Sequence, residues 1–211
     1  MKAFLHARLG KLTQLLRHSN DLIGRYNDAE AGLPDRLTQF LDQTAGCCRS
    51  LGLHEFEART VELEARYLMA RRGIDPESLE KHATHRRELE SKTAFRVLVS
   101  LSEQLRAGVE QDRQALASAE AQLRPILLAA VQRGMVVDAG TGSRAPTQAA
   151  ALDALWRRLL VDADLGLAAK QLAMIASLPD IVLLMGDLLS AIAPAPRRTR
   201  RRKPLAGLAE E

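Results

Sequence analysis

The apolar positions of this chain recur at alternating steps of three and four residues, which is the period of one face of an α-helix. Over residues 2–26 they form a heptad-like seam that is interrupted by Ser19. Further stripes cover residues 33–51 and 53–72, and a glycine follows each of them. We predict three antiparallel helices with short turns. The stripes comprise Leu5, Leu9, Leu12, Leu16, Ile23 and Tyr26; Leu37, Phe40, Leu41, Thr44 and Leu51; and Leu53, Phe56, Thr60, Leu63, Tyr67 and Ala70.

A much longer element follows, between a helix-opening signal at Asp75 and a helix-closing signal at Gly134. One helix over residues 76–133 would be roughly 85 Å long. A compact chain of this length is about 40–45 Å across. We therefore predict an elongated molecule whose long helix is kinked at Pro125, with Gly108 as a softer weak point.

The two parts of this long element differ in character. Residues 98–126 carry an extended apolar stripe that can pack against the earlier helices, whereas residues 80–92 are almost entirely polar. We expect the polar part to be solvated or to contact a polar partner. The candidate partner-binding residues are Lys81, His82, His85, Arg86 and Arg87.

The last third of the chain begins with a glycine-containing loop over residues 135–147. A helix is predicted over residues 148–177, with Gly166 as a weak point, and a last helix over residues 181–193 is apolar on most sides and therefore expected to be central. The stripe of the first of these helices contains Leu152, Leu155, Trp156, Leu159, Ala163, Leu167 and Met174. The predicted organisation is a helical bundle at 1–134, a loop at 135–147, C-terminal helices at 148–193 and a tail at 194–211.

Composition supports an all-α fold: an elongated helical bundle built on a long kinked helix, with a flexible basic C-terminal tail. Hydrophobic residues make up 46% of the 211 residues and aromatic residues 3%, which favours helices over a β-sandwich. The net charge of +4 is unevenly distributed, because residues 1–20 and 193–211 each carry +4 and the middle carries −4. A basic surface over the whole fold is therefore not implied.

The basic tail is the most distinctive chemical feature. Six cations within seven residues would bind a polyanion through counterion release, without sequence preference. We predict that nucleic acid is contacted by Arg197, Arg198, Arg200, Arg201, Arg202 and Lys203. An acidic protein, a membrane surface or a purely solubilising tail are the alternatives.

Catalytic and cofactor-binding motifs are hard to find in this chain. His82, His85 and Glu88 share one helical face and could form a metal site, but a charged, solvated face explains them more simply. Residues 135–143 resemble the first motif of Rossmann-like methyltransferases, yet no alternating strands and helices surround them. We assign no catalytic residue, metal or cofactor. Cys47 and Cys48 are adjacent, which fits a reducing cytoplasm, and one of them should be in the core.

These features favour a non-enzymatic helical interaction or scaffold protein, part of a larger assembly, with a protein partner or a second copy of itself and nucleic-acid contact through the tail. One alternative is a helical-bundle enzyme, with or without a metal ion. Another is a peripheral membrane-surface protein attached through the basic amphipathic residues 1–20. No secretory signal or membrane-spanning run is visible, so we expect a cytoplasmic location and regard a membrane partner as the weaker alternative.

Overall fold

The computed structural model describes residues 4–30, 32–81, 84–136 and 148–192, and these ranges are all-α, as predicted. No strand occurs within them, although a single bridge joins Ile74 to Lys81. The helices are α1 (Leu5–Asn27), α2 (Leu33–Ser50), α3 (His54–Arg71), α4 (Arg86–Gln132), α5 (Gln148–Val161), α6 (Gly166–Ile175) and α7 (Leu178–Ile192).

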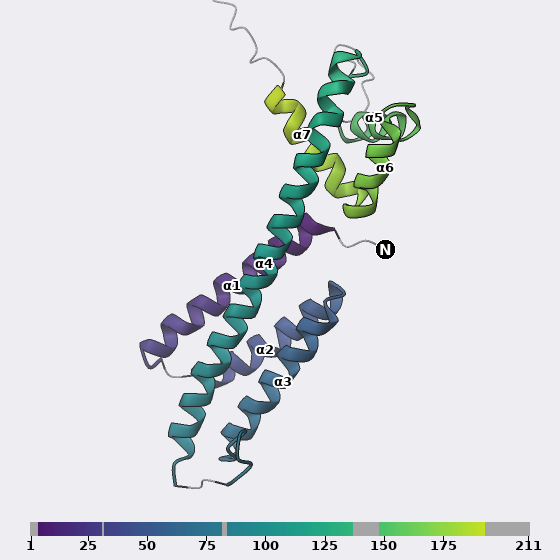
Figure 1. Cartoon of the computed structure of the whole chain (residues 1–211). Coiled ribbons are helices and arrows are strands. Elements are labelled where there is room, and N and C mark those ends of the chain that lie inside the picture. The colour runs from purple at the N-terminus through teal and green to yellow at the C-terminus, as the bar shows by residue number, and fades with distance from the viewer. Residues whose placement is uncertain (1–3, 31, 82–83, 137–147, 193–211) are drawn as a thin grey trace, which may run out of the picture.

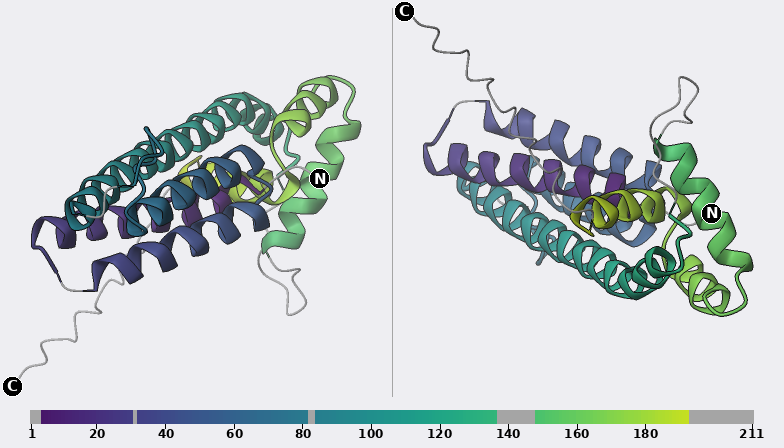
Figure 2. Two further views of the ribbon diagram at one scale, coloured as in Figure 1. Left: turned by 90° about the horizontal axis from the view of Figure 1, so that it is seen from below. Right: turned by 90° about the horizontal axis from the view of Figure 1, so that it is seen from above.

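The rest of the described chain is arranged around α4. This helix has 47 residues, so its length is about 70 Å. Helices α1, α2 and α3 pack around its first half, and α5, α6 and α7 gather at its second half (Figures 1 and 2). Helix α4 therefore contributes residues to both halves of the molecule. It continues through Pro125 without a stop, as predicted.

The first half of α4 forms the core of a four-helix arrangement. Leu98, Leu101 and Leu105 are fully buried there, which confirms the predicted stripe. Tyr67 from α3 and Phe40 from α2 pack into the same core. The outer positions of the first predicted seam are only partly buried, because α1 faces mainly α4: Leu9, Leu16, Ile23 and Tyr26.

A second core surrounds the other half of α4. Leu123 and Leu127 of α4 pack with Trp156 and Leu159 of α5 and with Met185 of α7. The two cores are separate clusters along the same helix. An apolar stripe that continues along α4 can thus organise two groups of helices at once.

The predicted helix start at Asp75 is wrong. Its carboxylate Oδ1 accepts a hydrogen bond from the backbone N–H of Glu77 at 2.8 Å, which closes a local turn. The Asp75 N–H donates to the Glu80 carbonyl at 2.9 Å, and Leu79 has a φ of +62°. An aspartate before a proline can cap a turn as well as a helix, and here α4 begins at Arg86.

The predicted helix over residues 148–177 is two helices. The Oδ1 atom of Asp162 accepts hydrogen bonds from the N–H groups of Asp164 at 3.0 Å and Leu165 at 2.9 Å. These bonds close a turn between α5 and α6, and α6 begins at Gly166. Because the helix is interrupted here, the residues of α6 do not continue the face on which the buried residues of α5 lie. Leu167 and Met174, expected in the core, are consequently 71% and 76% exposed.

A buried carboxylate in α7 joins the C-terminal helices to α1. Asp180 is fully buried and accepts hydrogen bonds from the backbone N–H groups of Leu5 at 2.9 Å and His6 at 3.0 Å. A second buried carboxylate, Asp112 of α4, accepts two hydrogen bonds from the Arg8 guanidinium. The N-terminal turns of α1 are thus held by α7 and α4 together.

Candidate functional site

The predicted partner-binding residues lie where the α3–α4 connection meets the start of α4. Lys81, His85, Arg86 and Arg87 are exposed there, and His82 lies outside the described residues. The connection turns back on itself through the bridge between Ile74 and Lys81. Arg86 and Arg87 occupy the first turn of α4, so both side chains project from the end of the bundle.

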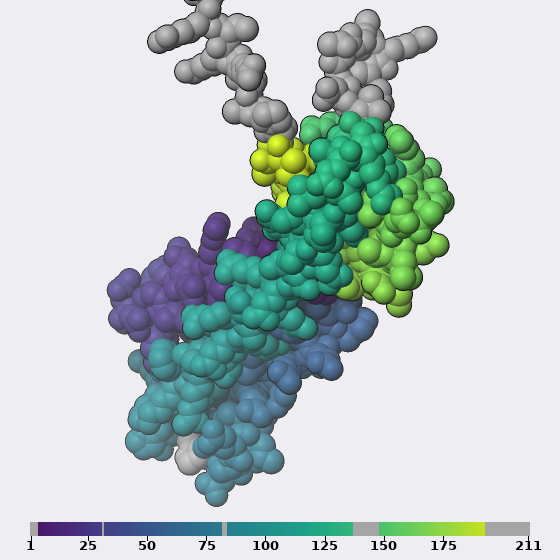
Figure 3. Space-filling model, turned by 45° about the horizontal axis from the view of Figure 1, so that its top comes forward, coloured from purple at the N-terminus to yellow at the C-terminus, as the bar shows by residue number. Residues whose placement is uncertain are grey.

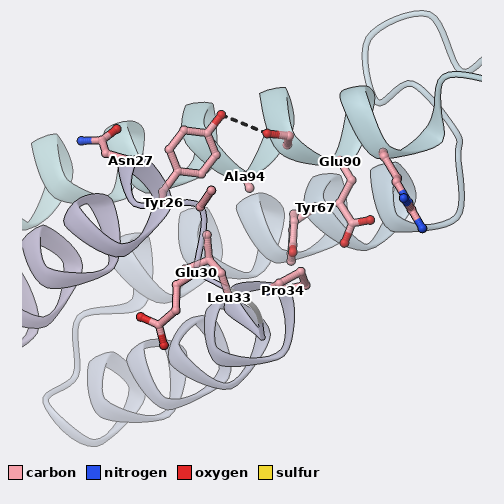
Figure 4. Close-up of a pocket in the computed structure, with 11 residues that line it drawn as sticks. Tyr26, Asn27, Glu30, Leu33, Pro34, Tyr67, Glu90 and Ala94 are labelled. Carbon is pink, nitrogen blue, oxygen red and sulfur yellow. Dashed lines mark hydrogen bonds between the residues drawn. The ribbon is translucent and has the colours of Figure 1, made fainter.

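A hollow of about 620 Å³ lies beside these residues, and we call it the bundle-end groove. Its walls come from the end of α1, the α1–α2 connection, the start of α2, α3 and the start of α4 (Figure 4). Segments distant in sequence therefore converge here. The lining residues are Tyr26, Asn27, Ala29, Glu30, Leu33, Pro34, Tyr67, Arg87, Glu90, Ser91 and Ala94.

The acidic side chains of the bundle-end groove are already ion-paired. Glu30 lies 3.1 Å from Arg25 and 2.7 Å from Arg36, and Glu90 lies 3.5 Å from Arg71. These carboxylates are therefore largely neutralised. The exposed guanidinium of Arg87 gives the mouth of the groove a cationic character.

Two tyrosines give the groove an aromatic wall. The Tyr26 hydroxyl and the Ser91 hydroxyl are 3.0 Å apart, which ties α1 to α4 (Figure 4). Tyr67 is fully buried. Burial, followed by the negative charge of Glu90, raises the pKa of Tyr67 well above its ordinary value. The phenol therefore stays neutral near pH 7.

The structure does not assemble a metal site from the residues that it describes. No group of three His, Cys, Asp or Glu side chains with metal-binding geometry occurs among them. The predicted trio is incomplete there because His82 lies outside these residues. His85 Nδ1 is 3.7 Å from Glu88, which also accepts a hydrogen bond from Lys92 at 2.6 Å. That bond to Lys92 lowers the pKa of Glu88, so the pair resembles an ordinary exposed ion-pair cluster.

A second exposed surface lies on the C-terminal helices α6 and α7. We define the apolar corner as Leu167, Met174, Ile175 and Leu178, which follow one side of α6 and the bend into α7. The space-filling view shows these C-terminal helices at the surface beside α4 (Figure 3). No helix in the described ranges is by itself long and apolar enough to cross a bilayer, although α6 and α7, bent by 118°, meet that length and composition as a pair.

The apolar corner was missed because periodicity assigns two of its residues, Leu167 and Met174, to a buried stripe. A usable signal was present in residues 162–166, where an aspartate that can close a turn precedes a helix-weakening glycine. The predicted nucleic-acid-binding residues of the tail, 197–203, lie outside the described residues. Their role stays a prediction.

Comparison with known proteins adds no functional assignment: no family model, no curated protein and no solved structure matches this chain.

Proposed function

We propose that this chain is a non-enzymatic helical interaction protein whose bundle-end groove receives an acidic segment of a protein partner. One observation carries the proposal: exposed Arg87 lines a groove to which α1, α2, α3 and α4 all contribute, and exposed Arg86 precedes it in the first turn of α4. Arginine and tyrosine are the side chains that most often dominate protein interfaces. A guanidinium also pairs with a carboxylate in two-point geometry.

Contacts between the walls of this groove support binding there. The Tyr26–Ser91 hydrogen bond and the ion pairs of Glu30 and Glu90 already order these side chains, which lowers the side-chain entropy lost on association. The nucleic-acid contact expected of residues 197–203 is a separate part of the proposed function, and it would act beyond the end of α7.

A site-specific photo-crosslinker tests the protein-binding proposal. Placed at Asn27, which is exposed and lines the groove, it should join the chain to a partner in cells or, if the partner is a second copy, to itself. Placed at Gln114, exposed on α4 away from the groove, it should not. With the crosslinker at Asn27, the Arg86→Glu/Arg87→Glu variant should lose the product, whereas Arg106→Glu/Arg113→Glu should keep it. Equal crosslinking at both positions, or none at Asn27, would contradict the proposal.

A further inference from the structure

The apolar corner combines strong exposure with an unusual lack of surface charge. Leu167 and Met174 are seven residues apart on one face of α6, and Ile175 and Leu178 continue the surface around the bend. Leu183, one turn into α7, is also exposed. A group of large exposed apolar side chains of this kind marks an interaction surface more often than ordinary protein exterior.

Residues 165–186 contain two charged side chains, Lys170 and Asp180. Asp180 is fully buried and bonded to the N-terminus of α1. Lys170 is exposed and lies between Leu167 and Met174 on the same face of α6. The exposed charge within this stretch is therefore a single cation in an apolar face; exposed Asp164, which is paired with Arg133 at 2.9 Å, and exposed Asp187 lie on either side of it.

This pattern fits a lipid surface better than a protein. Lysine is depleted in the cores of protein interfaces, because its strongly hydrated ammonium must lose water there. At a membrane the same side chain can extend its ammonium to the headgroups while its methylenes stay among the apolar residues. Anionic headgroups would also meet no opposing carboxylate on residues 165–186.

The sequence after α7 adds a second source of attraction. Six cations at positions 197–203 begin five residues beyond Ile192, the end of α7. Stable attachment to a membrane surface generally needs an apolar element and a polybasic segment together. Both are present at the C-terminal end of this chain.

We propose that the apolar corner docks on an anionic lipid surface, with Leu167, Met174, Ile175 and Leu178 at the level of the acyl chains and Lys170 at the headgroups. The proposal goes beyond the proposed function and does not depend on the bundle-end groove, which is lined by the start of α4, whereas α6 packs against the second half of α4. It also differs from attachment through residues 1–20, because the apolar side of α1 is packed against α4.

Vesicle flotation tests the proposal with the full chain. The protein should float with vesicles of phosphatidylcholine and phosphatidylglycerol at 3:1, and more weakly with phosphatidylcholine alone. Leu167→Glu/Met174→Glu should reduce vesicle affinity by more than about tenfold, since it removes two apolar side chains and adds two negative charges. A matched variant, Val61→Glu/Leu79→Glu, changes residues that are 46% and 69% exposed in the other half of the molecule and should bind as the wild type does. Circular dichroism of all variants verifies that they fold.

A depth measurement separates insertion from simple charge attraction. Tryptophan in the Met174→Trp variant should be quenched by lipids that carry a nitroxide on the acyl chain, whereas tryptophan in Val61→Trp should not. The native Trp156 is buried in the second core and gives a constant background.

Several outcomes would overturn the proposal. If Leu167→Glu/Met174→Glu floats as well as the wild type, the corner does not contact lipid. If flotation depends on residues 194–211 but Met174→Trp is not quenched, the attraction is purely electrostatic. If duplex DNA is bound and vesicles are not, nucleic acid is the partner of the tail; if the corner variant changes the sedimentation coefficient without any flotation, the corner joins two copies of the chain.

Discussion

At the scale of single residues, the most consequential side chain is Asp180. Helix α1 has no side-chain cap of its own at Phe4, and the first turn of any helix leaves N–H groups without intrahelical partners. Asp180 supplies the missing acceptor from a segment 175 residues away in the sequence. It also accepts a hydrogen bond from Ser177, and His6 Nδ1 lies 2.8 Å from its Oδ1. One carboxylate therefore joins the two halves of the fold.

Replacing this carboxylate by an amide should destabilise the protein in a pH-dependent manner. Burial alone would raise the pKa of Asp180, but the hydrogen bonds from Ser177, His6 and Leu5 outweigh it and hold the pKa below its ordinary value. The stabilisation is present above the unfolded-state pKa of about 3.9 and is lost as pH falls through the lower folded-state pKa. Asp180→Asn should cost about 1–3 kcal/mol at pH 7, because an amide cannot accept all these bonds.

Urea unfolding at pH 7 and pH 3 measures this effect. The difference between wild type and Asp180→Asn should be largest at pH 7 and should shrink at pH 3. Asp187→Asn, an exposed change on the same helix, serves as the control and should be nearly neutral. A difference between wild type and Asp180→Asn that does not change with pH would contradict the assignment.

The two adjacent cysteines should differ in reactivity although they are neighbours in sequence. Cys48 is fully buried, and burial raises its pKa to about 11, so little reactive thiolate exists near neutral pH. Cys47 is partly exposed. We expect one fast equivalent of alkylation by iodoacetamide, located at Cys47 by peptide mass spectrometry. Cys47→Ser should remove this fast phase, and Cys48 should react only after denaturation.

At the scale of elements, a glycine sets how closely α3 approaches α4. A Cβ atom at Gly108 would lie 2.8 Å from Cζ of Phe56. Helix propensity favours alanine over glycine by about 1 kcal/mol, but overpacking a close contact costs about 1–3 kcal/mol. Gly108→Ala should therefore fail to stabilise the protein and should lower its unfolding temperature.

The matched comparison for this prediction is Gly46 in the interior of α2, where an added Cβ meets no atom within 4 Å. Gly46→Ala should be stabilising by about 0.5–1 kcal/mol. Calorimetry of both variants distinguishes propensity from packing. Equal stabilisation by the two changes would show that Phe56 moves aside at little cost.

The elements also show which parts of the fold follow from local pattern. Leu98, Leu101 and Leu105 are buried because a three-and-four spacing predicts one helical face wherever the helix is continuous. The pattern fails where continuity fails. At Asp75 and Asp162 a side-chain carboxylate closes a turn, so that α4 starts later than the pattern predicts and Met174 is exposed.

The candidate sites were predictable to different degrees. The exposure of Arg86 and Arg87 follows from the polar composition of residues 80–92. The groove beside them does not, because its walls come from four helices whose packing is a tertiary property. The bonds of Asp180 to α1 were likewise invisible, since no local spacing relates positions 175 residues apart.

At the scale of the whole molecule, the bundle-end groove and the second core lie on different parts of α4, and the 25 residues from Ala94 to Ala119 place roughly 40 Å of helix between them. The groove and the apolar corner can therefore be occupied at the same time without steric conflict. A chain that binds a protein at one end and a charged surface at the other would hold the two at a fixed separation, which is the property expected of a scaffold.

The charge distribution leads to the last prediction, on nucleic acid. Residues 193–211 carry the whole net charge of +4, because the rest of the chain sums to zero. If all six cations of residues 197–203 meet phosphates, their removal should flatten the salt dependence of duplex-DNA affinity, in log–log form, by up to about five units. Fluorescence anisotropy over a range of salt concentrations measures this slope for the full chain and for a chain that ends at Ala193.

A variant with the order of residues 197–203 scrambled should keep the wild-type slope, since counterion release is independent of sequence. The Leu167→Glu/Met174→Glu variant should alter the slope little. An unchanged slope in the shortened chain would show that the tail does not take part in nucleic-acid binding. An anionic lipid surface would then be the polyanion to test.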